Sequence, residues 1–561
     1  MKTFDIEEIF KNTWKKIDVF YRKVFIIFFL SLNIVFIYNS LFCLFGIHDI
    51  YSLFAKISPI ETFYIGRFSV TWLEYFLSNK IVIPLFTNLI LFFFLSLTVI
   101  LMLHWFNVKK TLFNYLIPGL FVLLAPCIYV ILWYRTSCLG HLMTLFFLIV
   151  SFFISKNANS ESNLYKRYLY LAIALFFMVI FVFGAYPPII GIALGFLITK
   201  IFLDILGNNF SNIKQILMKY KYVYLLLSSS LFISYIIFEQ FKLCGLIRED
   251  DYNAKIIGFS EVLEYFPNFL YKTLNSFFFD TFPYIGVSYK LLLVLFVFLS
   301  FITLIVYICS KTDNVSSFIK RILLVFFVFV VLFYSFNIVY FLSPIFYTEP
   351  RFLRLEYWTT IYFVFICIII TLKYCNTFTK NILLLLACLV IFMNVQINMH
   401  IQKDQMIMQQ VELSRVMILK NLILSNKNYE YSDEIKYNFV RIGNLETSGY
   451  ISLYNSNEFT NNYFCELYQT FLNAQSFLSV IVNIPQKITN INPYFENVIN
   501  SPNEINKYLY NDNLREWLLY EAKVYPSFDC VFIDKGNIYV VMNKTLLTTI
   551  RTNLKENNYE L

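Results

Sequence analysis

Long apolar blocks separated by short polar segments run from about residue 24 to residue 400 of the 561-residue chain. A bilayer core about 30 Å thick requires about 20 consecutive apolar residues in each helix that crosses it. The pattern therefore predicts an all-α polytopic membrane bundle of about eleven transmembrane helices. We expect these helices near 24–46, 81–105, 112–134, 138–155, 168–184, 187–206, 222–241, 288–309, 322–344, 356–372 and 381–400.

The polarity of the chain changes after residue 400. Asn, Glu, Asp, Lys and Ser become frequent over 401–561, and no apolar run there is long enough to cross a bilayer. A helical pattern over Met406 to Leu424 opens this region. Near its end, two alternating runs at 529–533 and 537–541 flank Asp534-Lys535-Gly536, which is typical of a β-hairpin. We therefore predict a soluble C-terminal α+β domain.

Composition supports a membrane protein and excludes other classes. Apolar residues make up 58% of the chain and charged residues only 14%, whereas a soluble globular protein carries about 25% charged residues. These values exclude a soluble enzyme, a disordered scaffold and a disulfide-rich secreted domain. The net charge of +9 lies in short loops between apolar blocks, so it does not indicate binding to nucleic acid. The ten cysteines lack the spacing of a zinc or redox site.

Lysine and arginine are unevenly distributed between alternate loops. With the N-terminus inside, the inner segments hold 20 Lys and Arg in 85 residues, and the outer loops hold 11 in 102. Positive charge is enriched on the cytoplasmic side of membrane proteins, so we expect a cytoplasmic N-terminus and, after eleven spans, an external C-terminus. The predicted parts are a cytoplasmic amphipathic segment, a transmembrane domain with three larger outer loops, and an extracytoplasmic domain: 1–23, 24–400 with loops 47–80, 242–290 and 345–356, and 401–561.

The first outer loop carries candidate acid–base residues. Asp49 closely follows the first predicted span, and a partly desolvated carboxylate at the membrane surface is suited to accept a proton. The alternative is an interfacial acid that only marks the end of the helix. Glu61 lies further along the same loop and is the rival candidate for the base.

Arginines on the outer side are candidates for binding a phosphate. Arg351 and Arg354 lie in the last outer loop, and Arg67 and Arg135 belong to two other outer loops. A guanidinium stays charged and presents a planar fork that fits phosphate oxygens. Anchoring at lipid headgroups, or pairing with neighbouring glutamates, is the alternative. The acidic run Glu249-Asp250-Asp251 has the ligands for a divalent cation, but a solvated turn is the favoured interpretation, so we predict no metal site.

Several short motifs together resemble the bacterial serotype-converting O-antigen glucosyltransferases, which are polytopic membrane enzymes. The first outer loop has an acid followed by Gly-Arg and a bulky residue, here His48-Asp49 and Gly66-Arg67-Phe68. An outer turn contains Ala185-Tyr186-Pro187, and the closing segment begins with Tyr525-Pro526-Ser527. The chain departs from the family pattern by carrying one acid where the family has a pair, and it lacks the arginine expected soon after that acid.

The resemblance implies a C-type glycosyltransferase fold in the bacterial inner membrane. Such enzymes take a sugar from a polyprenyl-phosphate donor and pass it to a glycan on the periplasmic side. For this chain it implies a polyprenyl-phosphate glucose donor, an O-antigen or related surface glycan as acceptor, no cofactor, and a small flippase and a donor-synthesising glucosyltransferase as candidate partners. The site residues are then the base, Asp49 or Glu61; the donor-phosphate ligands, Arg67, Arg351, Arg354 and Arg135; and the pocket residues, His48, Glu74 and Tyr186.

Other functions remain open at this level. An O-antigen polymerase or a lipid A-modifying transferase would act on related substrates, and a polysaccharide or lipid flippase would be a transporter. A flippase needs a polar path, but mid-span positions are apolar apart from three histidines, Asp204 and Glu239, which disfavours transport. We expect both acids to face the membrane interface.

Cys465 and Cys530 are the only cysteines in 401–561, which we expect in an oxidising compartment. They either form a disulfide or remain two small buried thiols, and Cys244 in another outer loop is a rival partner.

Overall fold

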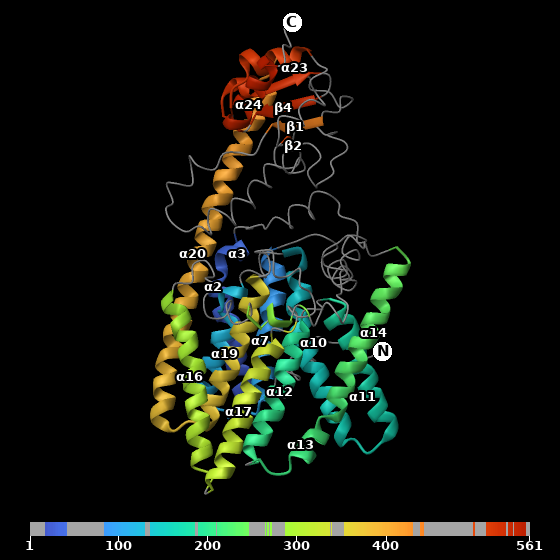
Figure 1. Cartoon of the computed structure of the whole chain (residues 1–561), viewed down its shortest axis with the longest axis vertical. Coiled ribbons are helices and arrows are strands. Elements are labelled where there is room, and N and C mark those ends of the chain that lie inside the picture. Colours follow the sequence, from blue (N-terminus) through green and yellow to red (C-terminus); the bar gives the residue numbers. More distant parts are fainter. Residues whose placement is uncertain are drawn as a thin grey trace, which may run out of the picture. The chain divides into compact units, whose positions relative to one another are not determined.

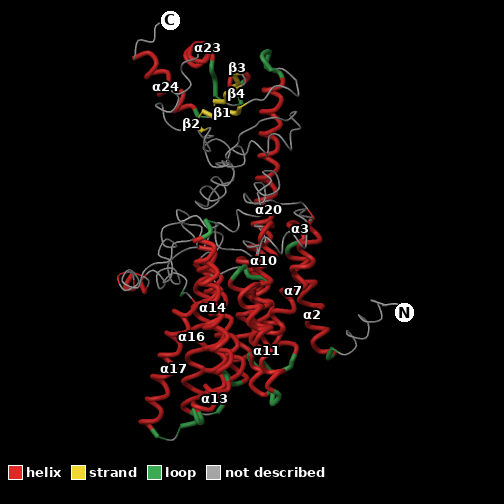
Figure 2. The backbone as a smooth tube through the Cα atoms, turned by 90° about the vertical axis from the view of Figure 1, so that its right-hand side faces the viewer, coloured by secondary structure: helices red, strands yellow, loops and turns green. Residues whose placement is uncertain are grey.

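The protein is represented by a computed structural model, and the chain divides into two compact units (Figures 1 and 2). The first unit ends at Gln402, and the second contains Lys403–Leu561. The structure describes residues 17–41, 84–128, 135–185, 189–208, 210–245, 264, 266–268, 270–271, 287–312, 314–336, 338, 353–429, 438–442, 498–499, 512–524, 526–534, 537–541 and 543–556.

The first unit is an all-α bundle, as the sequence predicts. Eight of its described helices are long and apolar enough to cross a membrane, which identifies a multi-pass membrane protein. The count of eleven spans stays a prediction, because the described apolar parts of α2, α8 and α19 are shorter than the others. The helices are α2 (Val19–Val35), α3 (Ile37–Leu41), α7 (Pro84–Trp105), α8 (Leu112–Leu123), α10 (Arg135–Ser160), α11 (Leu164–Phe176) with the π-helix η1 (Phe177–Phe183), α12 (Ile190–Gly207), α13 (Ile213–Lys219), α14 (Lys221–Leu243), α16 (Val287–Cys309), α17 (Val315–Phe336), α19 (Leu353–Tyr374) and α20 (Thr377–Leu424).

Two of the expected spans are interrupted. α2 begins at Val19, where Asp18 accepts a hydrogen bond from the backbone N–H of Phe20 at 2.9 Å, and it is interrupted at Phe36. Its start therefore corrects the predicted boundary at residue 24. α8 ends at Leu123, shortly before Pro126. Proline has no N–H and disfavours helical geometry in the residue before it, which accounts for the interruption of the expected span at Leu124 and Ala125.

Hydrogen bonds group the helix ends into two sets at opposite ends of the bundle. In one set, Asn39 of α3, Asn88 near the start of α7 and Gln402 of α20 are joined. In the other, Lys373 of α19 donates to the carbonyl of Phe106, which directly follows α7. Because α7 joins the two sets, they lie about 27 Å apart at 1.5 Å per helical residue. We call the first set the amide end and the second the lysine end.

Close contact between α12 and α17 depends on two glycines. Gly191 and Gly195 lie one turn apart near the start of α12. A Cβ atom at Gly191 would lie 2.3 Å from the carbonyl oxygen of Phe336, and one at Gly195 would lie 2.5 Å from the Phe336 ring. Small residues four apart let membrane helices approach this closely.

Replacing Gly191 with alanine should therefore destabilise the bundle. The clash is with backbone, which has no rotamer to move away, so we expect a loss in the range of about 1–3 kcal/mol. The measurement is the thermal unfolding midpoint of the detergent-purified chain. Gly207→Ala is the control on the same helix, because a Cβ there would meet nothing within 4 Å. Equal midpoints for the two variants would contradict the close contact.

α20 is one helix where the sequence predicts two elements. It has 48 residues and includes both the last expected span and the helix expected from Met406. No glycine or proline lies between residues 381 and 424, so nothing in the local sequence ends the helix. The change in polarity after residue 400 therefore falls inside a continuous helix.

The described part of the second unit combines a four-stranded sheet with short helices. The strand order is β2-β1-β4-β3; β1 is parallel to β2 and β4, and β3 is antiparallel to β4. The pairing of β3 with β4 confirms the predicted hairpin. The elements are β1 (Asn438–Ile442), β2 (Val498–Ile499), α23 (Asp512–Glu516), the π-helix η9 (Trp517–Glu521), the 3₁₀-helix η10 (Phe528–Cys530), β3 (Val531–Asp534), β4 (Asn537–Val541) and α24 (Lys544–Glu556).

The edge strand β3 is covered by the turn that follows α20. Asn426 donates from its side-chain amide to the carbonyl of Val531 at 3.0 Å, and Asn428 donates to that of Ile533 at 3.1 Å. Alternate carbonyls of a strand point to the same side, so two asparagines that are two residues apart can donate hydrogen bonds to two carbonyls on the outer edge of β3. They thereby occupy backbone groups that an exposed edge would offer to another strand.

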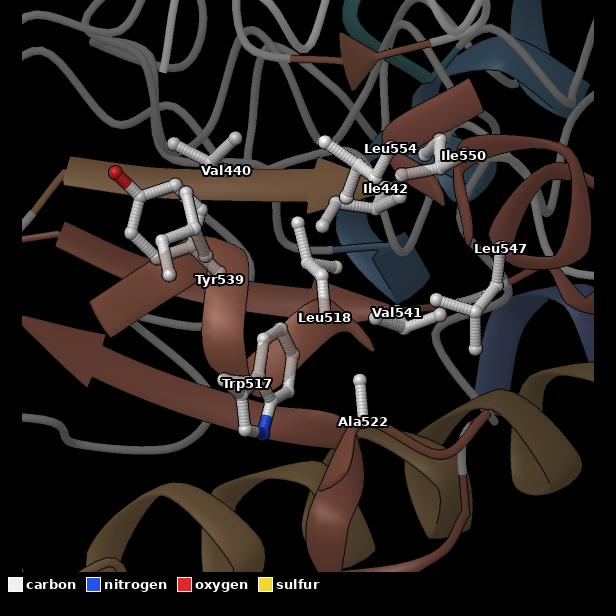
Figure 3. Packing of buried hydrophobic residues seen from close by; sticks show 11 residues of the cluster. Val440, Ile442, Trp517, Leu518, Ala522, Tyr539, Val541, Leu547, Ile550 and Leu554 are labelled. Atoms are coloured by element: carbon white, nitrogen blue, oxygen red, sulfur yellow. The ribbon is translucent and has the colours of Figure 1, made fainter. Parts of the chain in front are cut away.

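One face of the sheet packs on the helices to form a small core (Figure 3). Trp517 is 4% exposed and its ring stacks on Phe532 with centroids 5.1 Å apart. The buried cluster contains Val440, Ile442, Leu514, Trp517, Leu518, Ala522, Tyr539, Val541, Leu547, Ile550 and Leu554.

Cys530 is buried beside this core and is a free thiol. Burial raises the pKa of that thiol to about 12. The sequence left two alternatives for Cys530, a disulfide and a buried thiol; in the structure Cys530 is a buried thiol. Cys244 is also free, and it is exposed; Cys465 lies outside the described residues.

Trp517 should dominate the stability of the second unit. Truncating a fully packed aromatic side chain typically costs about 3–5 kcal/mol, so Trp517→Ala should make this unit sensitive to a protease that leaves the parent intact. Tyr520→Ala is the matched control, because Tyr520 lies in the same π-helix and is 70% exposed. Equal protease resistance of the parent and Trp517→Ala would refute this role.

Candidate functional site

The residues that the sequence assigns to the site fall largely outside the described part of the chain. Those outside it are His48, Asp49, Glu61, Arg67, Glu74, Tyr186 and Arg351. Arg135 and Arg354 lie at the beginnings of α10 and α19, where the structure describes the backbone but not these side chains. Contacts among the nine side chains are therefore not described.

The described helix ends nevertheless show at which end of the bundle the chain enters and leaves the segments that contain these residues. Segment 42–83 joins α3 to α7, and both helices meet it at the amide end. Segments 186–188 and 337–352 adjoin the start of α12 and the end of α17, which are in contact at Gly191 and Phe336. α10, α12 and α19 approach the lysine end with their last turns, so they begin at the opposite end.

Three amide side chains of α20 form the centre of the amide end. Asn394, Asn398 and Gln402 are four residues apart, lie on one helical face and are fully buried. Asn398 donates to the carbonyl of Leu124 at 2.8 Å, just past α8, and Gln402 donates to that of Val35 at 2.8 Å, the last residue of α2. These amides satisfy carbonyls left free where α8 and α2 stop.

Side chains from other helices complete this amide cluster. The backbone N–H of Asn39 donates to the Gln402 side chain at 3.0 Å, and Asn88 donates to the Asn39 side chain at 3.0 Å. Tyr289 at the start of α16 donates its hydroxyl to Asn394 at 2.5 Å. The cluster thus links α3, α7, α16 and α20.

One hydrogen-bond acceptor in the amide cluster has no donor among the described residues. The side-chain oxygen of Asn398 is buried and has no hydrogen-bond partner in the described part of the chain. A buried amide oxygen in this state is suited to accept a hydrogen bond from a hydroxyl group or water. The prediction from sequence misses the cluster because it considers only ionisable groups. The signal is visible, however, as amides at every fourth position of an otherwise apolar span.

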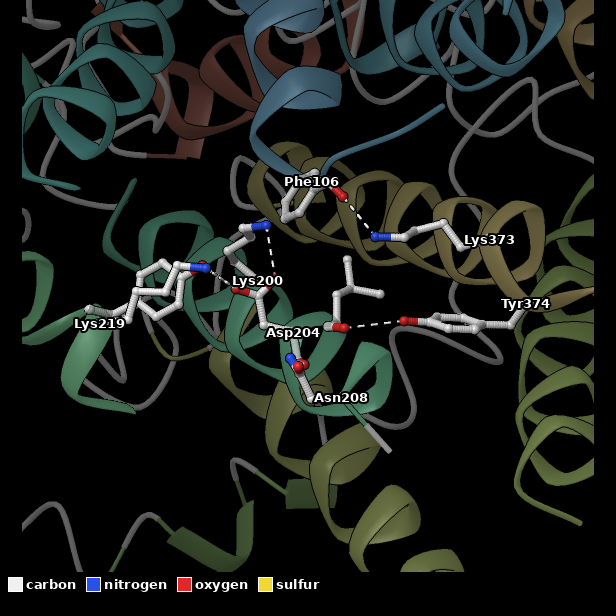
Figure 4. A network of polar contacts seen from close by, with 9 residues as sticks. Phe106, Lys200, Asp204, Asn208, Lys219, Lys373 and Tyr374 are labelled. Carbon is white, nitrogen blue, oxygen red and sulfur yellow. Dashed lines mark hydrogen bonds and ion pairs between the residues drawn. The ribbon is translucent and has the colours of Figure 1, made fainter. Parts of the chain in front are cut away.

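The lysine end holds a charged cluster centred on Asp204 (Figure 4). Asp204 accepts from Lys200 and Lys219 at 3.0 Å each, and from the hydroxyl of Tyr220 at 2.6 Å. The Lys200 side chain has no exposed surface, and that of Asp204 is 11% exposed. We define the lysine cluster as Lys156, Lys200, Asp204, Lys219, Tyr220 and Lys373.

This arrangement adds partners that the sequence does not predict. Asp204, expected only as an acid near a span end, is held by three donors within the bundle. Lys200, which lies within the expected span 187–206, is a buried residue of α12. Burial, together with the hydrogen bond to Asp204, raises the pKa of Tyr220, so this hydroxyl remains a proton donor at neutral pH.

The described histidines have surroundings typical of structural residues. His104 lies 3.2 Å from the Tyr21 hydroxyl and stacks on Phe153, and His400 is exposed. Among the described residues, no group of three or more His, Cys, Asp or Glu side chains is placed so that it can hold a metal ion.

Removing the carboxylate of Asp204 should strongly destabilise the bundle. Asp204→Asn leaves Lys200 charged and buried without its counter-ion, and breaking a buried pair from one side costs about 3–5 kcal/mol. The measurement is the thermal unfolding midpoint in detergent.

The control for this variant is Asp18→Asn, at the same end of the bundle. Asp18 pairs with Lys110 at 3.3 Å, but their side chains are 48% and 53% exposed, so we expect no measurable change. Equal loss in the two variants would show that burial of Lys200 does not decide the effect.

Compared with protein-family models, curated proteins and solved structures, the chain matches none of them.

Proposed function

We propose that this protein is a membrane glycosyltransferase that transfers glucose from a polyprenyl-phosphate donor to O-antigen or a related surface polysaccharide. In this proposal the amide end faces the periplasm of the bacterial inner membrane and the lysine end faces the cytoplasm. One structural observation supports it beyond the sequence resemblance: the segments that carry the predicted site residues all adjoin the amide end.

This convergence suits transfer between a lipid-linked donor and a glycan. The reaction needs a base, a phosphate-binding group and an acceptor within reach of one another at one membrane face. The candidates come from four separate parts of the sequence: the first outer loop, Arg135, Tyr186, and the Arg351–Arg354 region. Successive helices cross the bundle in alternate directions, so the helix ends that adjoin these four parts of the sequence all lie at the amide end. The second unit, which begins within α20 at Lys403, is proposed to hold the acceptor.

The distribution of lysine supports the orientation. Lys156, Lys200, Lys219 and Lys373 all lie at the lysine end. Lysines near the ends of membrane helices favour the cytoplasmic side. The amide end is then the periplasmic face, where the lipid-linked donor and the growing glycan are found.

In the proposed reaction an acceptor hydroxyl attacks the anomeric carbon of the donor sugar, and polyprenyl phosphate leaves. Asp49 takes the proton from the hydroxyl as the sugar–phosphate bond opens. Arg351 and Arg67 stabilise the negative charge that develops on the leaving phosphate, which lowers the energy of the transition state more than that of the ground state.

The test is mass analysis of surface polysaccharide from cells with and without the gene, followed by variants of the base. The parent gene should add one hexose to each repeat. Asp49→Asn keeps the shape of the side chain but removes the base, so we expect transfer to fall about 10²–10⁴-fold. Glu264→Gln is the control, because Glu264 is an exposed acid in another predicted outer loop.

The outcomes separate the base from the function. Full activity of Asp49→Asn with an inactive Glu61→Gln would move the base to Glu61 and leave the proposed function standing. An unchanged polysaccharide on adding the gene, or a reporter fused after residue 450 that signals from the cytoplasm, would refute the transferase proposal.

A further inference from the structure

The lysine cluster contains more positive than negative charge. Asp204 is its only carboxylate among the described residues, and its two oxygens are already engaged by Lys200, Lys219 and Tyr220. Lys156 and Lys373 both repel Lys200 electrostatically, and Lys219 repels Lys156. Four ammonium groups around one carboxylate leave an excess of three positive charges.

The two lysines of the cluster for which no hydrogen bond to Asp204 is described, Lys156 and Lys373, converge on the end of α7. The Lys156 ammonium lies over the Trp105 ring, 5.5 Å from its centroid. The Lys373 ammonium donates to the carbonyl of Phe106, the next residue, at 3.0 Å. Both contacts are with uncharged groups, so neither removes the excess charge.

The indole N–H of Trp105 is a second, independent group in this region that lacks a hydrogen-bond acceptor among the described residues. Its side chain is 1% exposed, and its indole N–H has no hydrogen-bond partner in the described part of the chain. The centroid of the same ring lies 6.1 Å from that of the Tyr220 ring, so Trp105 adjoins the lysine cluster. A buried N–H without an acceptor is costly, and an oxygen atom of an anion attracted by the surplus ammonium groups would supply that acceptor.

We propose that Lys156, Lys373 and Trp105 form a binding site for the phosphate group of an anionic phospholipid headgroup. Phosphate supplies both the negative charge and the acceptor oxygens. The cluster lies at an end of a membrane bundle, the depth at which headgroups are found, and basic pockets between helices at that depth bind such headgroups. Free phosphate has the same chemistry and is separated from the lipid by the test. The site is independent of the proposed glycosyl transfer, because it lies at the opposite end of the bundle.

The experiment measures binding of three probes to the full chain purified in neutral detergent. The probes are phosphatidylglycerol, phosphatidylcholine and inorganic phosphate. Binding of each probe is measured by the shift in the thermal unfolding midpoint and by titration. Phosphatidylglycerol should raise the midpoint more than phosphatidylcholine, and salt should weaken its binding. Lys156→Gln and Lys373→Gln should each reduce its affinity about fivefold, at about 1 kcal/mol for each lysine near an anionic headgroup.

Two further variants make the test specific. Trp105→Phe keeps an aromatic ring and removes the N–H, so it should also weaken binding of phosphatidylglycerol. Lys214→Gln is the matched control, because Lys214 is an exposed lysine of α13 at the same end of the bundle; it should bind as the parent does.

Equal binding of phosphatidylglycerol and phosphatidylcholine by the unaltered chain would overturn the proposal, whatever the variants do. So would an equal loss in Lys156→Gln and Lys214→Gln, which would indicate attraction by the surface charge alone. Inorganic phosphate that binds at the cluster and displaces phosphatidylglycerol at millimolar or lower concentration would reject the lipid and assign the site to free phosphate.

Discussion

The architecture of the bundle depends on satisfying backbone carbonyls where water is absent. Within a bilayer an unpaired carbonyl costs several kcal/mol, so a helix that stops inside a membrane protein needs a partner for its last turn. α2 and α8 both stop in this way, and side chains of α20 reach the carbonyls of Val35 and Leu124. α20 is long and uninterrupted, so one face of this helix can fix the positions along its axis of the ends of α2 and α8. The ends of the loops that carry the predicted site are thereby held as well.

The two polar clusters that the structure describes in the bundle differ in charge. The amide cluster consists of neutral amides and a hydroxyl, which form hydrogen bonds without requiring a counter-ion. In the lysine cluster, the pair of Lys200 with Asp204 persists because each group compensates the charge of the other where both side chains are largely buried. The excess of lysine in this second cluster agrees with the proposed orientation, in which the lysine end faces the cytoplasm.

The two units are stabilised by different kinds of packing. In the first unit, Gly191 and Gly195 remove side chains so that α12 and α17 meet at backbone distance. In the second unit, Trp517 and the strands around it form an apolar core, and Asn426 and Asn428 cover the edge of β3. The membrane unit therefore relies on close approach and hydrogen bonds, because burial of apolar surface provides little driving force inside lipid, whereas the described part of the second unit relies on that burial.

The sequence by itself determined the class of the molecule, because the length and polarity of each block reflect the solvent around it. It therefore predicted the helical bundle, the loss of apolar spans after residue 400 and the hairpin of β3 and β4. Tertiary structure alone decided which polar residues meet. Asn39 and Gln402 are 363 residues apart, and Lys373 and Phe106 are 267 apart, yet both pairs are hydrogen-bonded. Local patterns carry no information about such partners, since the partners are selected by helices packing side by side. For the same reason the sequence shows only that Asp204 lies near a helix end, and its partners Lys219 and Tyr220 were decided by the packing of α13 and the start of α14 against α12.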